Sequence, residues 1–146
     1  MKILTGNYEY FLDEKGRTRI PQVVKEILGE NLYVGKGMGS FLAVYSQEAL
    51  EEKSELAKQY QEIRTGSEEE IRMVSYYRDF FADMAPFVSD NQKRYRIPKN
   101  LINYANLKDK ILLVGNNTVL EIWSPELYLR RRERDVGFSR LDPKVE

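Results

Sequence analysis

Short apolar runs separated by polar turns occur along most of the chain, in the same order twice. Apolar runs bounded by Gly, Pro, Asn or Asp are typical of β-strands. Such runs cover residues 8–12, 32–34 and 41–45, and then residues 85–88, 111–114 and 119–123. The pattern predicts, in each set, a strand, a tight turn, a strand that ends at proline, a short helix, two more strands and a longer helix.

Helix-starting residues fall in the same order in both sets. Proline stops a strand and suits the first turn of a helix, and serine is a favoured N-cap. The residues concerned are Pro21, Pro98, Ser46 and Ser124. They predict short helices over residues 22–28 and 99–105, and a longer helix after each serine.

The segment between the two sets has a helical pattern. Ser67 and Glu70 have the spacing of a capping box, and apolar residues follow them at intervals of three and four. The segment therefore predicts a pair of helices. Its aromatic cluster of Tyr77, Phe80 and Phe81 is expected to lie in a hydrophobic core, because such residues are usually buried.

The two sets also share residues. The stretch Asp-Glu-Lys-Gly-Arg-Thr-Arg-Ile-Pro at residues 13–21 aligns with Asp-Asn-Gln-Lys-Arg-Tyr-Arg-Ile-Pro at residues 90–98. The offset is constant, since 90 − 13 and 98 − 21 are both 77, and it predicts an internal repeat. The expected parts are a first module at residues 5–50, a central helical segment at 51–82, a second module at 83–128 and a charged tail at 129–146.

Composition excludes many kinds of site. The chain has 146 residues, of which 42% are hydrophobic, enough for one compact domain or two intertwined halves with a shared core. It has no cysteine and no histidine, which excludes disulfides, thiolate metal sites and imidazole bases. We expect no metal and no other cofactor. The polar start and the lack of any run of about 18 apolar residues predict a cytoplasmic protein with no signal peptide and no membrane contact.

Charge is balanced in total but separated along the chain. Lys and Arg number 23, as do Asp and Glu, so the net charge is zero instead of the basic excess typical of nucleic-acid-binding proteins. Acidic residues dominate residues 48–70, whereas basic residues cluster at 15–25, 93–99 and 130–134. The position of charge decides local binding, so these clusters still predict contact with polyanions.

The basic turn of each repeat has a pattern suited to DNA. Strand side chains alternate between faces, so Arg17 and Arg19 share one face while Thr18 points to the other. Arg94 and Arg96 share a face in the same way. Guanidinium groups bind phosphates and the edges of guanine bases. The predicted DNA contacts are Lys15, Arg17, Arg19, Lys93, Arg94 and Arg96.

The aspartate of each turn has two compatible roles. Asp13 can pair with Arg17, and Asp90 with Arg94, as a structural staple without a ligand, since surface pairs of this kind are common and weak. An aspartate that orients its arginine also leaves other guanidinium donors free. We therefore assign a turn-orienting role to Asp13, Asp90 and Gly16, the glycine because it readily adopts a positive φ.

These residues carry a resemblance to a known family. The Asp-x-Lys-Gly-Arg turn followed by Ile-Pro resembles the MraZ family of bacterial transcriptional regulators. The second repeat has the same turn with Gln92 and Lys93 in place of the lysine and the glycine. The similarity spans residues 8 to about 131 and includes the strand Leu120-Glu121-Ile122-Trp123. It implies an α+β fold in which two SpoVT/AbrB-like halves interleave into a pseudo-twofold, double-split (swapped-hairpin) β-barrel with peripheral helices.

The resemblance also implies a function. It implies a homo-oligomeric ring that binds double-stranded DNA at short promoter repeats of the division and cell-wall gene cluster. The chain is then a nucleoid-associated regulator and not an enzyme, with no small-molecule substrate. The family's Asp-x-x-x-Arg motif falls on Asp13 with Arg17 and on Asp90 with Arg94, which makes both arginines the implied DNA contacts.

The chain departs from the family pattern at three positions. Lys93 stands where the family has glycine, so the second turn must either accept a non-glycine residue at positive φ or change shape. Thr18 and Tyr95 stand where the family usually has aliphatic core residues, which weakens the case for a purely packing role. We therefore expect a stronger DNA contact from Arg17 than from Arg94.

Three alternative functions stay open. An enzyme would use Asp13 and Asp90 as a carboxylate pair, although the nearby arginines lower their pKa and disfavour an acid role. An AbrB-like antitoxin or protein-interaction module would chiefly bind a protein, although this chain has two modules and only a brief charged end. The arginine run at residues 130–134 would bind a membrane or another polyanion, or would simply form a solvated helix end.

Overall fold

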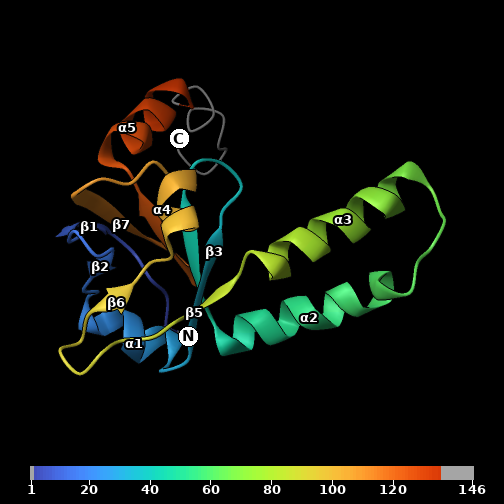
Figure 1. The fold of residues 1–146 in the computed structure, drawn as a ribbon, viewed down its shortest axis with the longest axis horizontal. Helices are drawn as coiled ribbons and strands as arrows, with labels where there is room; N and C mark the ends of the chain where they lie inside the picture. Colours follow the sequence, from blue (N-terminus) through green and yellow to red (C-terminus); the bar gives the residue numbers. More distant parts are fainter. Residues whose placement is uncertain (1, 136–146) are drawn as a thin grey trace, which may run out of the picture.

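The computed structural model describes residues 2–135 and has a mixed α+β fold. Figure 1 shows a twisted sheet with short helices around it and a long helical hairpin to one side. The strands are β1 (Asn7–Phe11), β2 (Arg17–Thr18), β3 (Leu32–Lys36), β4 (Leu42–Ser46), β5 (Ala85–Phe87), β6 (Tyr95–Arg96), β7 (Lys110–Asn116) and β8 (Val119–Trp123). The helices are α1 (Gln22–Leu28), α2 (Gln47–Gln61), α3 (Glu68–Ala82), α4 (Lys99–Tyr104) and α5 (Pro125–Arg134). The α+β prediction is confirmed.

Strands from the two halves of the chain are interleaved within one large antiparallel sheet. Its six strands have the order β1-β7-β8-β4-β3-β5, and β2 pairs separately with β6. Three pairs in the large sheet, β1 with β7, β4 with β8 and β3 with β5, join an early strand to a late one. Within the described residues, β1 and β5 are the edges and do not pair with each other, so the strand order does not close into a barrel.

The strand order is symmetric about its centre. It reads the same from either end when each early strand is exchanged for its late counterpart, β1 for β5, β3 for β7 and β4 for β8. In the central β4–β8 pair, Leu42 lies opposite Ile122 and Val44 opposite Leu120. Val44 and Ile122 are equivalent positions in the aligned sequences, as are Leu42 and Leu120, so the same exchange converts one pair into the other.

One hydrophobic core serves both halves. The large side chains with almost no exposure come from each set of strands and from α1 and α4. They are Val24, Val34, Leu42, Val44, Phe87, Ile97, Leu101, Ile111, Leu113, Leu120 and Ile122. Burial of these groups is the main driving force for folding, so neither half holds a complete core of its own.

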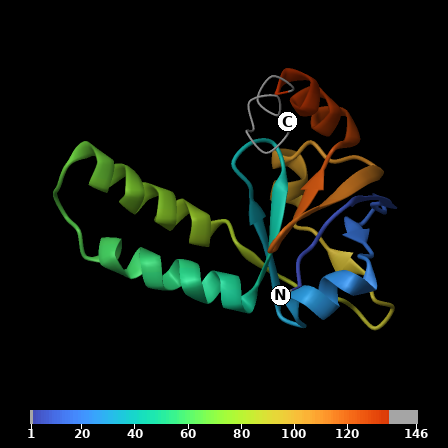
Figure 2. The same ribbon diagram turned by 180° about the vertical axis from the view of Figure 1, so that it is seen from behind.

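The helical hairpin of α2 and α3 projects from the sheet on the side away from β2 and β6 (Figures 1 and 2). The predicted caps are present: Ser46 Oγ accepts the N–H of Ala49 at 3.0 Å, and Ser67 forms a capping box with Glu70. The two helices pack through aromatic rings, with Tyr60 and Tyr77 stacked at 5.6 Å between centroids.

The expectation of a core role for the hairpin's aromatic residues is wrong. Phe81 is 37% exposed, and Tyr77 and Phe80 are only half-buried. Helices α2 and α3 contact little beyond each other and β4, so the rest of the protein does not cover these rings completely. A local pattern of apolar spacing predicts which face of a helix packs, but not whether the rest of the protein covers it.

Helix α5 follows β8 and carries the whole C-terminal arginine run at residues 130–134. Its N-cap is Ser124, as predicted, and it continues to Arg134. The beginning of the expected charged tail is therefore helical, and residues 136–146 lie outside the described part of the chain. Within residues 2–135, none of the helices combines the length and apolar content needed to cross a membrane.

Candidate nucleic-acid interface

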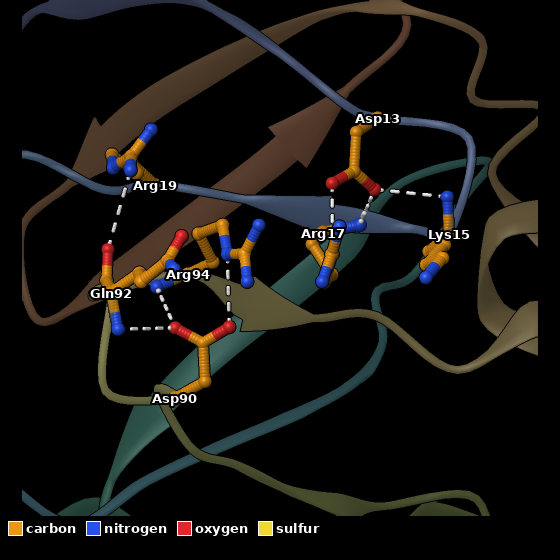
Figure 3. A network of polar contacts seen from close by, with 7 residues as sticks. All are labelled: Asp13, Lys15, Arg17, Arg19, Asp90, Gln92 and Arg94. Atoms are coloured by element: carbon orange, nitrogen blue, oxygen red, sulfur yellow. Dashed lines mark hydrogen bonds and ion pairs between the residues drawn. The ribbon is translucent and has the colours of Figure 1, made fainter.

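The first basic turn is held together by the carboxylate of Asp13. Its Oδ1 accepts the backbone N–H groups of Lys15 and Arg17, both at 2.9 Å, and its Oδ2 accepts Nε of Arg17 at 2.8 Å. The backbone closes the same turn, because the N–H of Gly16 donates to the carbonyl of Asp13 at 3.0 Å. Figure 3 shows this fan of contacts around a single carboxylate. Asp13 thus fixes both the turn and the direction of the Arg17 side chain.

The second turn repeats this geometry atom for atom. Oδ1 of Asp90 accepts the N–H groups of Gln92 at 2.8 Å and Arg94 at 3.0 Å, and Oδ2 accepts Nε of Arg94 at 2.9 Å (Figure 3). The N–H of Lys93 donates to the carbonyl of Asp90 at 3.0 Å, as Gly16 does in the first turn. Two turns far apart in the sequence therefore present an arginine in the same way.

Lys93 accepts the backbone conformation that its position demands. Its φ is +61°, close to the +78° of Gly16. A non-glycine residue in this left-handed region costs about 1–2 kcal/mol, but the turn keeps its hydrogen bonds. The second turn therefore accepts a non-glycine residue at positive φ and keeps the shape of the first turn.

Gly16 is required for a second reason, namely close packing. A Cβ atom built on Gly16 would lie 3.0 Å from Cδ1 of Ile102 and 3.1 Å from the carbonyl oxygen of Ile97. The turn therefore rests directly on α4 and on the residue that follows β6. Positive φ alone is tolerated at Lys93, so the glycine of the first turn is explained by the combination of conformation and contact.

Each aspartate leaves the outer end of its arginine available. Within residues 2–135, neither Arg17 nor Arg94 uses Nη1 or Nη2 in a hydrogen bond or ion pair, because only Nε is engaged. The two side chains are 23% and 26% exposed. Their Nη groups are thus free to donate to phosphate or to the O6 and N7 atoms of guanine.

The carboxylates themselves are poor candidates for acid chemistry. The pKa of Asp13 is lowered chiefly by the backbone N–H of Arg17, with its side chain and charge acting in the same direction. The backbone N–H of Arg94 lowers the pKa of Asp90 in the same way. A carboxylate that accepts three hydrogen bonds stays ionised at neutral pH. Within residues 2–135, no three acidic side chains gather as metal ligands.

Strands β2 and β6 join the two turns into one ribbon. Thr18 lies opposite Tyr95, and Arg17 opposite Arg96. Nη2 of Arg19 donates to the carbonyl of Gln92 in the other turn at 3.3 Å, a cross-link visible in Figure 3. The ribbon therefore brings the four predicted arginines from both halves onto one surface.

The inner face of this ribbon belongs to the core. Thr18 and Tyr95 are each only 3% exposed, and the ring of Tyr95 stacks on Phe87 at 4.8 Å between centroids. Their departure from the aliphatic pattern therefore does not weaken a packing role. The predicted alternation holds, since Arg17, Arg19 and the equivalent arginines lie on the outer face while these two residues are buried.

The turn lysines lie at the exposed tips. Lys15 and Lys93 are both exposed, and so are Arg19 and Arg96. The structure brings one further cation, which no sequence motif indicated, close to the first turn. This residue is Lys108, which follows α4 in sequence and lines a groove beside the first turn. Only the sheet pairing brings it there, so spacing along the chain gave no signal for it.

Comparison with known proteins shows the family to which this chain is related. A family model described as "MraZ protein, putative antitoxin-like" matches residues 81–142. A protein of Caldicellulosiruptor saccharolyticus named transcriptional regulator MraZ is 32% identical over 145 residues, which is 99% of this chain and 97% of the relative. Relatives with the same name from Clostridium acetobutylicum and Acetivibrio thermocellus are 32% and 36% identical, over 96% and 81% of this chain and 94% and 78% of their own lengths.

Proposed function

The chain belongs to the MraZ family, and from this premise we propose that it is a sequence-specific, DNA-binding transcriptional regulator. The observation that carries the proposal is the duplicated turn, in which an aspartate fixes Nε of an arginine and leaves both Nη groups free. A mere staple does not need Lys15, Arg19 or the other exposed cations of the ribbon. Oriented arginines with free Nη groups are suited to bidentate recognition of guanine.

The proposed architecture follows the family resemblance. The modules at residues 5–50 and 83–128 are two SpoVT/AbrB-like units with swapped hairpins, interleaved about a pseudo-twofold axis, with the segment at 51–82 as an insertion between them. The pairing of early with late strands at three places in the sheet supports this proposal. A regulator of this kind would lie in the cytoplasm, in association with the nucleoid.

The proposed active form is a homo-oligomeric ring. A chain of zero net charge with a few free arginines gains affinity when several protomers bind several DNA repeats at once. Exposed apolar side chains on the hairpin, such as Leu56 at 54% and Ile71 at 50% exposure, support self-association through that element. The target is then a set of short promoter repeats of the division and cell-wall gene cluster.

Fluorescence anisotropy with DNA from the region upstream of the protein's own gene tests the proposal. We expect Arg17→Ala and Arg94→Ala each to lower the affinity by about 5- to 150-fold, since a bidentate contact contributes about 1–3 kcal/mol. The control is Arg72→Ala on the exposed face of α3, which should leave binding unchanged. Equal affinity of the Arg17→Ala variant and the wild type would exclude DNA reading by this turn.

A second candidate function is binding of a protein partner, as in an antitoxin-type module. The projecting hairpin with its exposed Leu56, Ile71 and Phe81 favours it, because exposed apolar patches mark interaction surfaces. Purification of the protein from its native host would distinguish the two. A small protein that co-purifies in stoichiometric amount, together with no promoter affinity, would replace the DNA-binding proposal.

A further inference from the structure

A groove with a volume of about 650 Å³ lies beside the first basic turn. Its walls come from both halves of the chain: the turn at Lys15 and Gly16 forms one wall, and Arg96, Lys99 and Lys108 contribute to the other. The groove therefore begins where the proposed reading surface of Arg17 ends. It extends that surface toward α4.

The two walls are held at a fixed separation by backbone hydrogen bonds. The N–H of Ile97 donates to the carbonyl of Gly16 at 2.8 Å, and the N–H of Leu12 donates to the carbonyl of Asp109 at 2.7 Å. These bonds flank the turn on both sides. The backbone that carries the cations on the α4 side is thus placed relative to the first turn before any ligand binds, which lowers the entropic cost of a shared ligand.

The groove carries an excess of unpaired positive charge. Within residues 2–135, none of its four cations forms an ion pair, and all four are exposed. They are Lys15, Arg96, Lys99 and Lys108. Of the carboxylates in the lining, Asp13 is already paired with Arg17, which leaves Glu14 and Asp109. An extended anion with closely spaced charges matches this distribution better than a single small ion.

The second turn lacks such a flank although its own geometry is the same. The offset of 77 places Gln22 at the position of Lys99 and Glu26 at the position of Asn103, so these two positions carry a charge of −1 instead of +1. The lysine of α1, Lys25, lies with its Nζ 3.9 Å from a carboxylate oxygen of Glu30. The two turns therefore have the same hydrogen bonds, but the residues that flank them carry different charges.

We propose that Lys99 and Lys108 bind backbone phosphates of the DNA immediately beyond the base pairs that the first turn reads, so that each protomer grips DNA more strongly on one side. This inference rests on the proposed function and deepens it. Phosphate contacts fix the register and orientation of a protein on the duplex. The asymmetry would give a nearly twofold-symmetric protomer a defined direction on its DNA repeat.

The salt dependence of binding measures these contacts. Each neutralised phosphate adds about 0.9 to the log–log slope of affinity against salt. We expect the double variant Lys99→Gln/Lys108→Gln to lower that slope by about 2 per bound protomer. If the variant and the wild type bind equally at 1 M salt, this change in slope lowers the affinity of the variant about 30-fold at 0.15 M salt. The probe is the duplex defined by footprinting the region upstream of the protein's own gene. Lys58→Gln on the hairpin is the matched control and should change neither quantity.

A gain-of-function variant keeps the test independent of folding defects. Gln22→Lys/Glu26→Asn gives the second turn the counterparts of Lys99 and Asn103, and we expect it to raise the salt slope by about 1. Trimming the duplex at one end should reproduce the loss seen with Lys99→Gln/Lys108→Gln, whereas trimming the other end should have no effect.

The outcomes separate this inference from the proposed function. If the wild type and Arg17→Ala differ as expected but Lys99→Gln/Lys108→Gln keeps the wild-type slope, the groove does not bind phosphate and the regulator proposal stands. If the wild type shows no affinity for promoter DNA, both proposals are overturned. Equal losses on trimming either end would overturn the directional grip.

Discussion

At the scale of single residues, the two turns show how one carboxylate determines the direction of a long cation. Arginine has several rotatable bonds, and fixing them costs conformational entropy on binding. Asp13 and Asp90 each fix Nε of their arginine within the free protein, so that part of this cost is met during folding. The same bonds hold the turn, which is why a staple role and a recognition role do not compete.

The glycine and lysine at equivalent turn positions allow a prediction about stability. We expect Gly16→Ala to lower the free energy of unfolding by about 2 kcal/mol, since an alanine there is strained at positive φ and overpacks Ile102 and the carbonyl of Ile97. Lys93→Gly removes strain but adds freedom to the unfolded chain, so we expect a change below about 1 kcal/mol. Urea denaturation of both variants measures the difference. A loss of only about 1 kcal/mol for Gly16→Ala, the cost of positive φ by itself, would show that conformation alone, and not packing, sets the requirement.

At the scale of elements, the sequence predicts what is local and misses what depends on distant segments. Caps at Ser46, Ser67 and Ser124 and the positions of most strands are encoded within a few residues, so the structure agrees with them. The exposure of Phe81 and the approach of Lys108 to the first turn depend on which surfaces the fold leaves uncovered or brings together. Neither has a signature in residue spacing.

The hairpin is the element whose stability should separate from the rest. Ser67→Ala removes the capping box of α3, a loss of about 1 kcal/mol. Because α2 and α3 contact little outside their own pair, we expect faster hydrogen exchange in α3 and the end of α2, with no change in the sheet. Exchange measured by mass spectrometry, with Ser75→Ala as a control on the exposed face of the same helix, tests this expectation. Uniform acceleration across the sheet would show that the hairpin unfolds only with the whole protein.

At the scale of the whole molecule, the interleaving of strands makes the two halves depend on each other. Strands β1, β4 and β3 each pair with a strand from the far half, and the buried residues of both halves meet in one core. Such non-local pairing cannot be read from either repeat alone, since each repeat predicts only its own strands. It also fixes the ribbon of β2 and β6, so the reading surface exists only when both halves are folded.

This dependence predicts a single cooperative unfolding transition. Trp123, the one tryptophan of the chain, lies in β8 and stacks on Phe41 of the other half at 4.5 Å between centroids, so its fluorescence reports on the contact between halves. Ile122→Ala, at a side chain with no exposed surface, should cost about 3 kcal/mol because it leaves a cavity in the shared core. We expect the fluorescence and circular dichroism transitions of this variant to shift together in urea. Two separate midpoints would show that one half folds alone, and then the two turns would no longer form an obligatory unit. A shared midpoint would mean that a destabilising core substitution in either half lowers the folded population of both turns at once. Neither Arg17 nor Arg94 is then oriented unless both halves are folded.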